Sequence, residues 1–286
     1  MVPAQVRSEP EGIVVLFLDP IGGDLSRLRV LLSAHISNGT TLNLPRGCKF
    51  TIDEFVGGDP EAFEGHLELA PTFANLADYL DRTGEPPLPP YIERVPDKED
   101  TKSYQTVFAN TPGAIAAPTA GLHFHAGLLA RLQSVGVDYV TVTLHVGYGT
   151  FRSIEAKFVE NHKMDAERYH ISSKSSEAIW RALKEGRRVI AVGTTSTRTL
   201  ETNAAALLGP SPPGDLRGQS TLFIYPPYNF KILSGLVTNF HYPKTSVLTL
   251  TSAFCGSKEL LIDLIYKEAL AKDYLWYSYG DGMIVL

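Results

Sequence analysis

Short apolar runs separated by turn residues fill the first part of the chain. Four of these runs have the length and branched side chains of strands, and they cover residues 13–18, 28–32, 49–55 and 66–69. Asn38–Gly39 and Arg46–Gly47 are turn signals between them. Several short strands with turns between them predict a small antiparallel barrel or sandwich. We therefore expect residues 1–75 to form a small β-barrel domain.

The pattern changes around a proline-rich stretch. A short helix is expected from residue 76, and Gly84–Tyr91 then carries four prolines in five positions, which predicts a stiff, extended linker. Beyond it, apolar positions predict helices over 128–135 and 175–185 and strands over 138–144 and 188–192. Helices that alternate with buried strands are typical of an α/β layer. We expect the α/β fold class, with a large α/β domain over residues 76–286 that carries the active site.

Composition narrows the class of protein. Of the 286 residues, 44% are hydrophobic and 20% are charged, as in folded globular chains. Cys48 and Cys255 are isolated and give neither a disulfide framework nor a Cys-x-x-Cys metal motif. No apolar run approaches the roughly 18 residues of a membrane helix, and Met1–Ala4 lacks the features of a signal peptide. These features predict a cytoplasmic protein.

Charge is unevenly distributed along the chain. Residues 1–100 hold 8 Lys/Arg and 17 Asp/Glu, a balance of −9, whereas the remaining residues have a balance of +4. A basic region on an acidic chain is compatible with local binding of a polyanion, and equally with ordinary solvated surface. The run 161–169, which includes Lys163, Asp165 and Glu167, is typical of solvated surface.

Residues 116–125 concentrate a turn, a hydroxyl and two imidazoles. A proline and a glycine bracket Thr119, which predicts a chain reversal, and apolar residues follow at helical spacing. We expect Thr119 near the N-cap of a helix, with His123 and His125 on its first turn. Two histidines two positions apart do not have the spacing of a helical metal pair, so no metal is predicted.

Hydroxyl groups open a second predicted helix. Thr194, Thr195 and Arg198 follow the strand that ends at residue 192. Backbone N–H groups at a helix start bind a phosphate or carboxylate, and an arginine grips such a group with two nitrogens. The alternative is a plain N-cap, with Arg198 paired to Glu201.

Glycines flank further candidate positions. Gly147 and Gly149 follow the strand that ends at residue 144 and allow close approach of a ligand, and Asp281 lies between two glycines near the end of the chain.

Aromatic residues are interleaved with prolines over residues 223–246. Tyr225 and Phe240, with the polar His241 and Lys244 nearby, fit a stacking wall of the kind that holds a purine. Aromatic residues at such spacing equally fit a hydrophobic core.

A series of longer motifs then occurs in one order along the chain. They include Ala-Pro-Thr-Ala-Gly-Leu-His-Phe, Thr-Leu-His-Val-Gly-x-Gly-Thr-Phe, His-Lys-Met, Val-Gly-Thr-Thr-Ser-x-Arg-Thr-Leu-Glu, Phe-Ile-Tyr-Pro, Asn-Phe-His-x-Pro-Lys and Tyr-Gly-Asp. In these motifs the chain resembles the S-adenosylmethionine:tRNA ribosyltransferase-isomerase family of queuosine biosynthesis. The resemblance covers nearly everything from Leu80 to Ile284.

The resemblance implies a fold and a reaction. The fold is a large α/β domain with a small β-barrel. The reaction moves the ribosyl group of S-adenosylmethionine onto 7-aminomethyl-7-deazaguanine, a base in the GUN anticodon of the tRNA. S-adenosylmethionine is a co-substrate and not a cofactor. Epoxyqueuosine-tRNA forms, and adenine and methionine are released. The chemistry begins with loss of the C5′ proton next to the sulfonium, followed by opening of the sugar and departure of adenine. No obligate protein partner is implied.

The resemblance also suggests residue roles. His123 or His145 acts as base or acid, and Asp281 contacts the ribose or the incoming amine. Lys163 and Lys244 contact the tRNA backbone. The expected substrate-binding residues are Thr119, Gly147, Gly149, Thr194, Thr195, Arg198, Tyr225, Phe240 and His241.

The chain departs from the family pattern in several places. Family members carry a further N-terminal stretch before the segment that Val2–Ala4 matches, so we expect the α/β domain to be incomplete at its N-terminal side. Substitutions relative to the pattern fall at His125, Tyr148, Asp165, Pro227 and Gly282. At position 282 the family pattern has alanine.

Two other interpretations remain. One is a catalytically inactive relative that binds a nucleoside or RNA, which the absent stretch and the substitutions favour. The other is a phosphate-binding transferase or metal hydrolase, built on the Gly-Thr-Thr loop and the histidines.

Overall fold

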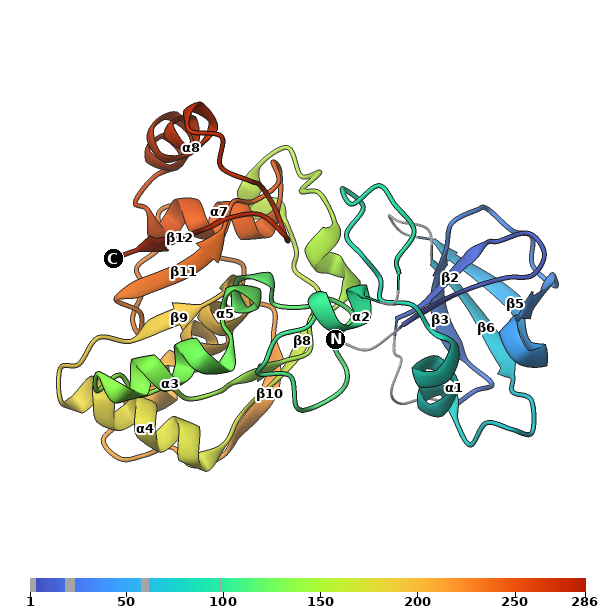
Figure 1. Ribbon diagram of the computed structural model, residues 1–286, viewed down its shortest axis with the longest axis horizontal. Helices are drawn as coiled ribbons and strands as arrows, with labels where there is room; N and C mark the ends of the chain where they lie inside the picture. Colours follow the sequence, from blue (N-terminus) through green and yellow to red (C-terminus); the bar gives the residue numbers. More distant parts are fainter. Residues whose placement is uncertain (1–3, 19–23, 58–61, 98) are drawn as a thin grey trace. The chain divides into compact units, whose positions relative to one another are not determined.

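A computed structural model describes residues 4–18, 24–57, 62–97 and 99–286. The chain divides into two compact units, whose helices and strands are labelled in Figure 1. The first unit comprises Met1–Tyr104 with Asn110–Ala117, and the second comprises Gln105–Ala109 with Pro118–Leu286.

An antiparallel, barrel-like sheet forms the first unit, with the strand order β1-β2-β3-β6-β5-β4. Its strands are β1 (Gln5–Arg7), β2 (Val14–Phe17), β3 (Leu28–Leu32), β4 (Thr41–Leu44), β5 (Cys48–Gly57) and β6 (Ala62–Glu68). Side chains alternate between the two faces, so Phe50 and Ile52 of β5 are fully buried while Lys49 is exposed. The predicted small antiparallel barrel is confirmed. The run predicted at 66–69 is only the end of the longer β6.

Helix α1 (Leu76–Thr83) completes the barrel core. Asn75 caps it, because its side chain accepts a hydrogen bond from the N–H of Asp78 at 2.9 Å. Leu76, Tyr79 and Leu80 are buried in the same hydrophobic cluster as the barrel strands. The sequence pattern predicts a boundary between residues 75 and 76, whereas α1 lies in the first unit because this apolar face packs on the strands.

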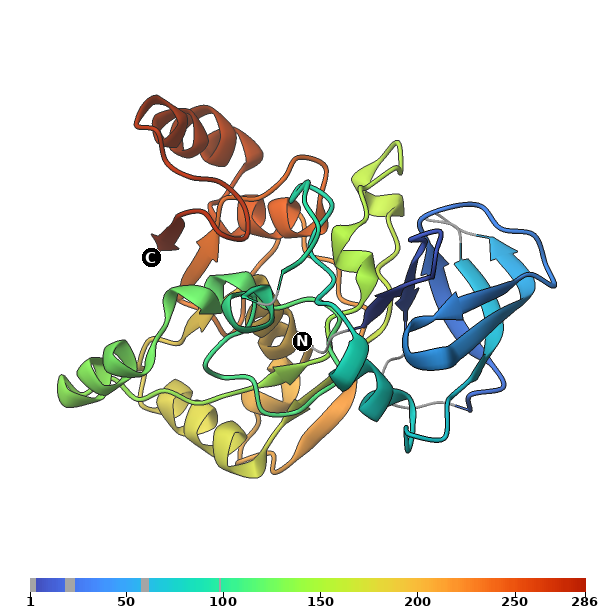
Figure 2. The same cartoon turned by 45° about the vertical axis from the view of Figure 1, so that its right-hand side comes forward.

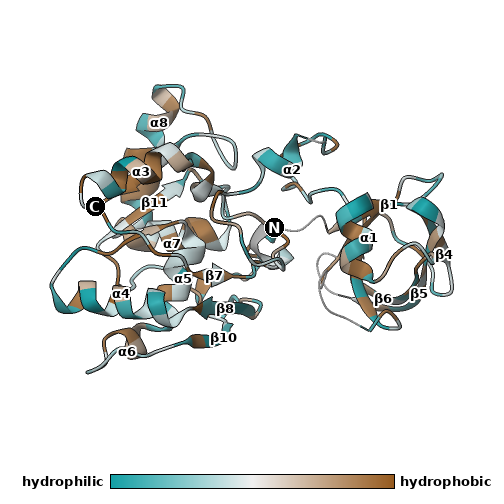
Figure 3. Ribbon diagram, turned by 60° about the horizontal axis from the view of Figure 1, so that its bottom comes forward, coloured by the Kyte–Doolittle hydropathy of each residue, from teal (hydrophilic) through white to brown (hydrophobic). Residues whose placement is uncertain are grey.

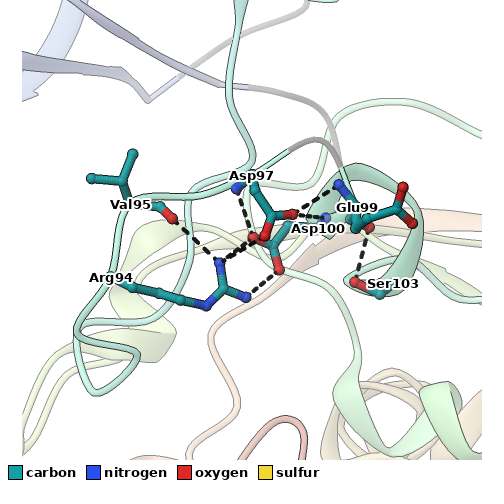
Figure 4. Close-up of polar contacts among 6 residues, drawn as sticks. All are labelled: Arg94, Val95, Asp97, Glu99, Asp100 and Ser103. Atoms are coloured by element: carbon teal, nitrogen blue, oxygen red, sulfur yellow. Dashed lines mark hydrogen bonds and ion pairs between the residues drawn. The ribbon is translucent and has the colours of Figure 1, made fainter.

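A buried carboxylate organises the segment after the proline-rich stretch (Figure 4). Asp100, the first residue of α2 (Asp100–Ser103), is 1% exposed and binds both terminal nitrogens of Arg94, at 2.6 and 2.7 Å. The N–H of Asp97 donates to the same carboxylate at 2.9 Å. The Asp97 side chain in turn accepts from the N–H of Glu99 at 2.8 Å. These local bonds hold Arg94, Asp97 and Asp100 together.

Two three-stranded sheets form the framework of the second unit in the described residues. One has the order β10-β8-β7, and its strands are β7 (Thr143–Leu144), β8 (Glu167–Ile171) and β10 (Leu216–Ser220). The other has the order β12-β11-β9, and its strands are β9 (Ile190–Val192), β11 (Gly235–Asn239) and β12 (Gly282–Val285). Only β9 and β11 pair in parallel among these strands.

Helices pack around these sheets, as expected for an α/β domain (Figure 2). They are α3 (Ala126–Ser134), α4 (Ser173–Lys184), α5 (Thr194–Thr202), α6 (Ala204–Leu207), α7 (Ser246–Phe254), the π-helix η5 (Leu260–Tyr266) and α8 (Lys267–Ala271). Short 3₁₀ helices are η1 (Pro45–Gly47), η2 (Thr119–His123), η3 (Tyr148–Phe151) and η4 (Val159–Asn161). Helix α5 packs against β7, β9, β10 and β11, and is therefore the central helix of the unit. The predicted combination of an α/β domain with a small barrel is confirmed.

Two local predictions need correction. Thr119 opens the 3₁₀ helix η2 and not an α-helix; α3 begins later, with His125 as its N-cap. Of the strand predicted over 138–144, only the last two residues pair, because the residues before them meet no strand in the described ranges. Helix α3, part of which is brown in Figure 3, contains no buried residue.

Candidate active site

The carboxyl ends of two parallel strands define one edge of the β12-β11-β9 sheet. Leu236 of β11 lies opposite Ala191 of β9, so Asn239, the last residue of β11, and Gly193, which follows β9, lie at the same edge. Strand β12 runs antiparallel and begins there, with Gly282 opposite Asn239. Open α/β sheets bind ligands outside the carboxyl ends of their strands. We therefore take this edge as the candidate active site.

The first turn of α5 brings backbone N–H and hydroxyl groups to this edge. Gly193 has a φ of +89°, which turns the chain from β9 into α5, and its N–H donates to a carbonyl of β11 at 2.8 Å. A Cβ on Gly193 would lie 3.8 Å from the Cβ of Ala120, so η2 lies beside the start of α5. Thr194 and Thr195 lie at this start of α5, in a position that suits an anionic group, and Thr119 precedes Ala120 in η2.

His123 reaches the same edge from the end of η2. Its Nε2 lies 3.2 Å from Nδ2 of Asn239, and this Nδ2 also donates to the carbonyl of Tyr277 at 3.1 Å. The ring fills the space where Gly282 lacks a side chain, since a Cβ there would lie 2.9 Å from Nε2. The Oδ1 of Asn239 is buried and has no hydrogen-bond partner within the described residues. His123 and Asn239 form the polar centre of the edge.

Asp281 shapes the loop that enters β12. Its carboxylate accepts a hydrogen bond from the N–H of Leu275 at 2.8 Å, and its own N–H donates to the Leu275 carbonyl at 2.9 Å. Its neighbour Gly282 contacts His123. The structure thus brings Asp281 to the same edge as His123, with one carboxylate oxygen engaged by the loop.

A buried ion pair joins the Gly147 loop to α5. The carboxylate of Glu167, which is 4% exposed, binds Nη1 of Arg198 and accepts from the N–H of Gly147 at 3.1 Å. The Nε of Arg198 donates to the carbonyl of Leu222 at 3.1 Å. One arginine thereby links β8, α5 and the segment after β10.

Arg198 is enclosed by protein. The residue is 7% exposed, and only its Nη2 has no hydrogen-bond partner in the described part of the chain. Bidentate binding of a ligand would need Arg198 nitrogens that already donate to protein groups. Only Nη2 is left to bind a ligand. The alternative pairing with Glu201 is wrong, because Glu201 accepts from the N–H groups of Lys231 and Ile232 at 3.0 and 2.9 Å.

His145 follows β7 with one ring nitrogen unengaged. The backbone N–H of His145 donates to the carbonyl of Arg168 at 2.8 Å, and its ring Nδ1 is buried without a partner in the described residues. Burial lowers the pKa of His145, and the charge of Arg168 lowers it further. The imidazole is therefore neutral near pH 7, as a general base must be. No contact within the described ranges joins His145 to His123.

The run 161–169 only partly matches the expected solvated surface. Lys163 and Asp165 are exposed, whereas Glu167 is buried because Arg198 and Gly147 satisfy its carboxylate. The Asp165 carboxylate lies against Gly149, where any Cβ would collide with it, and 3.4 Å from Nη1 of Arg152. Asp165 thus supports the loop that contains Gly149.

The predicted aromatic wall separates into two environments. Tyr225 is partly exposed and lies beside Phe223, with ring centroids 5.3 Å apart, and Phe223 contacts His162 at 4.8 Å. Phe240 is 3% exposed and packs on Tyr266 in the core, so little of its ring is open to a ligand.

His241 and Lys244 follow β11. The Nε2 of His241 lies 2.7 Å from the hydroxyl of Thr238, and burial lowers the pKa of His241 to about 4. Its imidazole is therefore neutral at physiological pH. Lys244 is exposed, and its carbonyl accepts from the N–H of Ile154 at 2.7 Å.

The described residues hold no group of three or more His, Cys, Asp or Glu side chains placed to bind a metal ion. None of the helices in the described ranges is both long and apolar enough to cross a membrane.

Comparison with known families relates these features to a biochemical function. Residues 2–285 match the family model described as queuosine biosynthesis protein. The chain belongs to the queuosine biosynthesis family. The family indicated by the sequence motifs is confirmed, and so is the prediction of an enzyme.

Individual relatives carry a common description. The S-adenosylmethionine:tRNA ribosyltransferase-isomerase of Polynucleobacter necessarius subsp. necessarius is 40% identical, over 100% of this chain and 79% of the relative. The protein of the same description from Geobacter sulfurreducens is 47% identical, over 86% of this chain and 69% of the relative. The crystal structure of S-adenosylmethionine tRNA ribosyltransferase from Thermotoga maritima aligns with a TM-score of 0.47 and 25% identity, over 100% of this chain and 79% of that one.

Two residues of the site are not among the site residues predicted from the sequence, although Asn239 begins one of the quoted motifs. Asn239 ends an apolar run at the carboxyl end of a strand, which is a signal for a ligand site. Glu167 lies in a charged run, and its burial depends on Arg198 from another element. Only the first of these could have been found from the sequence pattern.

Proposed function

We propose that this chain transfers and isomerises the ribosyl moiety of S-adenosylmethionine onto 7-aminomethyl-7-deazaguanine in the anticodon of tRNA with a GUN anticodon. Epoxyqueuosine-tRNA is formed, and adenine and methionine leave. Membership of the queuosine biosynthesis family supports this function, as do the names of the relatives. The observation that carries the proposal is the meeting of His123, Asn239 and the start of α5 at one sheet edge.

Removal of the substrate proton falls to a histidine in this proposal. The reaction requires removal of the C5′ proton beside the sulfonium, and a neutral imidazole with an unengaged nitrogen suits this task. His145 meets both conditions, because burial keeps it neutral and its Nδ1 has no partner in the described residues. Asp281 contacts the ribose or the incoming amine through the carboxylate oxygen that does not bind Leu275.

Substrate binding uses the loops around α5. The methionine carboxylate binds at the start of α5, at Thr194 and Thr195, with η2 and its Thr119 beside it. Tyr225 stacks on adenine, and Gly147 and Gly149 allow the backbone to approach the ligand. Arg198 contributes mainly by supporting the Gly147 loop through Glu167.

The tRNA meets exposed lysines. Lys163 and Lys244 contact its phosphates. S-adenosylmethionine is consumed as a co-substrate, and the proposed reaction uses no further cofactor. The proposed setting is the cytoplasm.

The test is incubation of the purified chain with S-adenosylmethionine and tRNA that bears 7-aminomethyl-7-deazaguanine. We expect adenine, methionine and modified tRNA to appear in equal amounts. Binding of both substrates without release of adenine would instead support the inactive relative and contradict the proposal.

A further inference from the structure

The protein fixes the orientation of the Asn239 carboxamide. Asn239 is 1% exposed at the end of β11. Its Nδ2 lies 3.1 Å from the backbone carbonyl oxygen of Tyr277, an atom that can only accept a hydrogen bond. An oxygen in place of this Nδ2 would face another oxygen. The nitrogen and oxygen of the carboxamide therefore cannot be exchanged.

This orientation determines the tautomer of His123. The same Nδ2 lies 3.2 Å from Nε2 of His123. An amide nitrogen donates and does not accept, so Nε2 of His123 is the acceptor. A neutral imidazole that accepts at Nε2 carries its hydrogen on Nδ1.

Gly282 holds the ring in this position. A Cβ on Gly282 would lie 2.9 Å from Nε2 and 3.1 Å from Cδ2 of His123, so this edge of the ring lies directly on the backbone of β12. The residue as a whole is exposed. The opposite edge, which carries Nδ1, is therefore the one that can meet a substrate.

We propose that Asn239 is a positioning residue that holds His123 in the Nδ1–H tautomer, so that His123 donates a hydrogen bond to departing adenine and does not act as the base. This inference rests on the proposed function. In this tautomer the lone pair of Nε2 is engaged by Asn239 and Nδ1 already bears hydrogen, so neither nitrogen can take a proton from carbon. The carbon-bound proton goes to another group, for which His145 is the candidate.

The role of His123 is electrostatic. When the bond between the ribose and adenine breaks, its electron pair leaves with adenine, and the Nδ1–H group stabilises the charge that develops on a ring nitrogen. His123 neither gains nor loses a proton in this step. Adenine afterwards takes its proton from water.

The first arm of the test measures the tautomer directly. Long-range ¹H–¹⁵N correlation spectra of the full chain with ¹⁵N-labelled histidine report which ring nitrogen carries hydrogen, and His123→Ala identifies the His123 signal. We expect hydrogen on Nδ1 in the wild-type protein. Hydrogen on Nε2 would overturn the proposal, whatever the activity.

The second arm links the tautomer to turnover. The carboxylate of Asn239→Asp can only accept, so the hydrogen should move to Nε2 of His123 and kcat should fall about 100-fold, the usual effect of losing one such donor. The KM for S-adenosylmethionine should change less than about threefold, because the interaction is made in the transition state. Asn229→Asp is the matched control, because Asn229 is exposed and the charge change is the same.

The remaining outcomes separate this inference from the proposed function. A changed tautomer with an unchanged kcat would overturn the role of Asn239. If Asn239→Asp does not fold, Asn239→Ala replaces it, and it should give a mixture of tautomers with a lower kcat. Absence of turnover in the wild-type protein would overturn the proposed function, and with it the role of His123, while the spectra would still report the bond to Asn239.

Discussion

Glu167 and Arg198 bury opposite charges between β8 and α5, with side chains only 4% and 9% exposed. Each group also binds backbone, at Gly147 and at Leu222 respectively. A charge in the interior depends on such partners, because water no longer solvates it. The pair therefore attaches the Gly147 loop to α5 more firmly than an exposed pair would.

Glu167→Gln should lower the free energy of unfolding by about 3–5 kcal/mol, because it leaves the Arg198 guanidinium buried without a countercharge. The matched control is Glu177→Gln on α4, since Glu177 forms an exposed pair with Arg181 and should cost less than about 0.5 kcal/mol. Urea unfolding followed by circular dichroism measures both. Equal losses would show that burial does not strengthen the Glu167 pair.

His145→Ala should reduce turnover at least about 100-fold, since a general base typically contributes 10²–10⁴-fold. Release of adenine from S-adenosylmethionine measures the loss, and circular dichroism checks that the fold is kept. His66→Ala in the barrel, where His66 is exposed beside Asp53, is the control and should keep full turnover. Retained activity of His145→Ala would remove His145 from the mechanism.

Elements with strong local patterns were predictable. The branched run 28–32 is β3 itself, and α5 begins where the Gly-Thr-Thr sequence predicts a helix start. The apolar run 138–144 fails as a complete strand because a strand needs a partner, and pairing depends on other segments. The same reasoning applies to the site: Thr194 and Gly147 follow strands and could be proposed, whereas the burial of Glu167 depends on a residue 31 positions away.

Gly282→Ala tests the packing of β12 against η2. The added Cβ would lie 2.9 Å from Nε2 of His123 and 3.3 Å from the carbonyl of Thr238, so the ring must move. We expect kcat to fall about 10- to 100-fold, because small displacements of catalytic groups have effects of this size.

Steady-state kinetics measure this effect. The control is Gly127→Ala in α3, where the new Cβ meets only the His125 ring, at 3.2 Å, and turnover should stay the same. Unchanged turnover of Gly282→Ala would mean that the exact position of His123 is not critical, in agreement with the alanine that the family pattern has there.

On the scale of the whole molecule, partly buried histidines couple stability to pH. The pKa of His241 is about 4 in the folded protein, against an ordinary value of about 6.5 in the unfolded chain. Between these values the unfolded chain binds a proton that the folded protein excludes, so stability is complete above about pH 6.5 and falls as the pH decreases. Burial also lowers the pKa of His145 and of His162, which acts in the same direction.

The free energy of unfolding should therefore decrease between about pH 6.5 and pH 4, by about 3 kcal/mol for His241 alone. Urea unfolding at a series of pH values measures this slope. His241→Gln should make the slope shallower over this range, and an unchanged slope would show that His241 is not excluded from protonation.

Charge also differs along the chain. Residues 1–100 have a balance of −9 and the rest a balance of +4, and both candidate tRNA contacts, Lys163 and Lys244, lie in the second unit. The double variant Lys163→Gln/Lys244→Gln should weaken tRNA binding and reduce the slope of log affinity against log salt by about 2. Binding titrations at several salt concentrations measure this, with Lys174→Gln on α4 as the control. A slope equal to that of the control would exclude both lysines from the tRNA interface.

The hydrogen bond between His123 and Asn239 joins residues 116 positions apart, whereas the barrel pairs strands that are close in sequence, such as β4 with β5 and β5 with β6. Contacts between distant segments cost more chain entropy to close and form later in folding. The barrel can therefore form while the edge that we take as the candidate active site is still unassembled. A mild destabilisation would abolish catalytic activity before it changes the spectroscopic signature of the barrel. Catalytic activity is therefore the more sensitive measure of whether this protein has reached its native state.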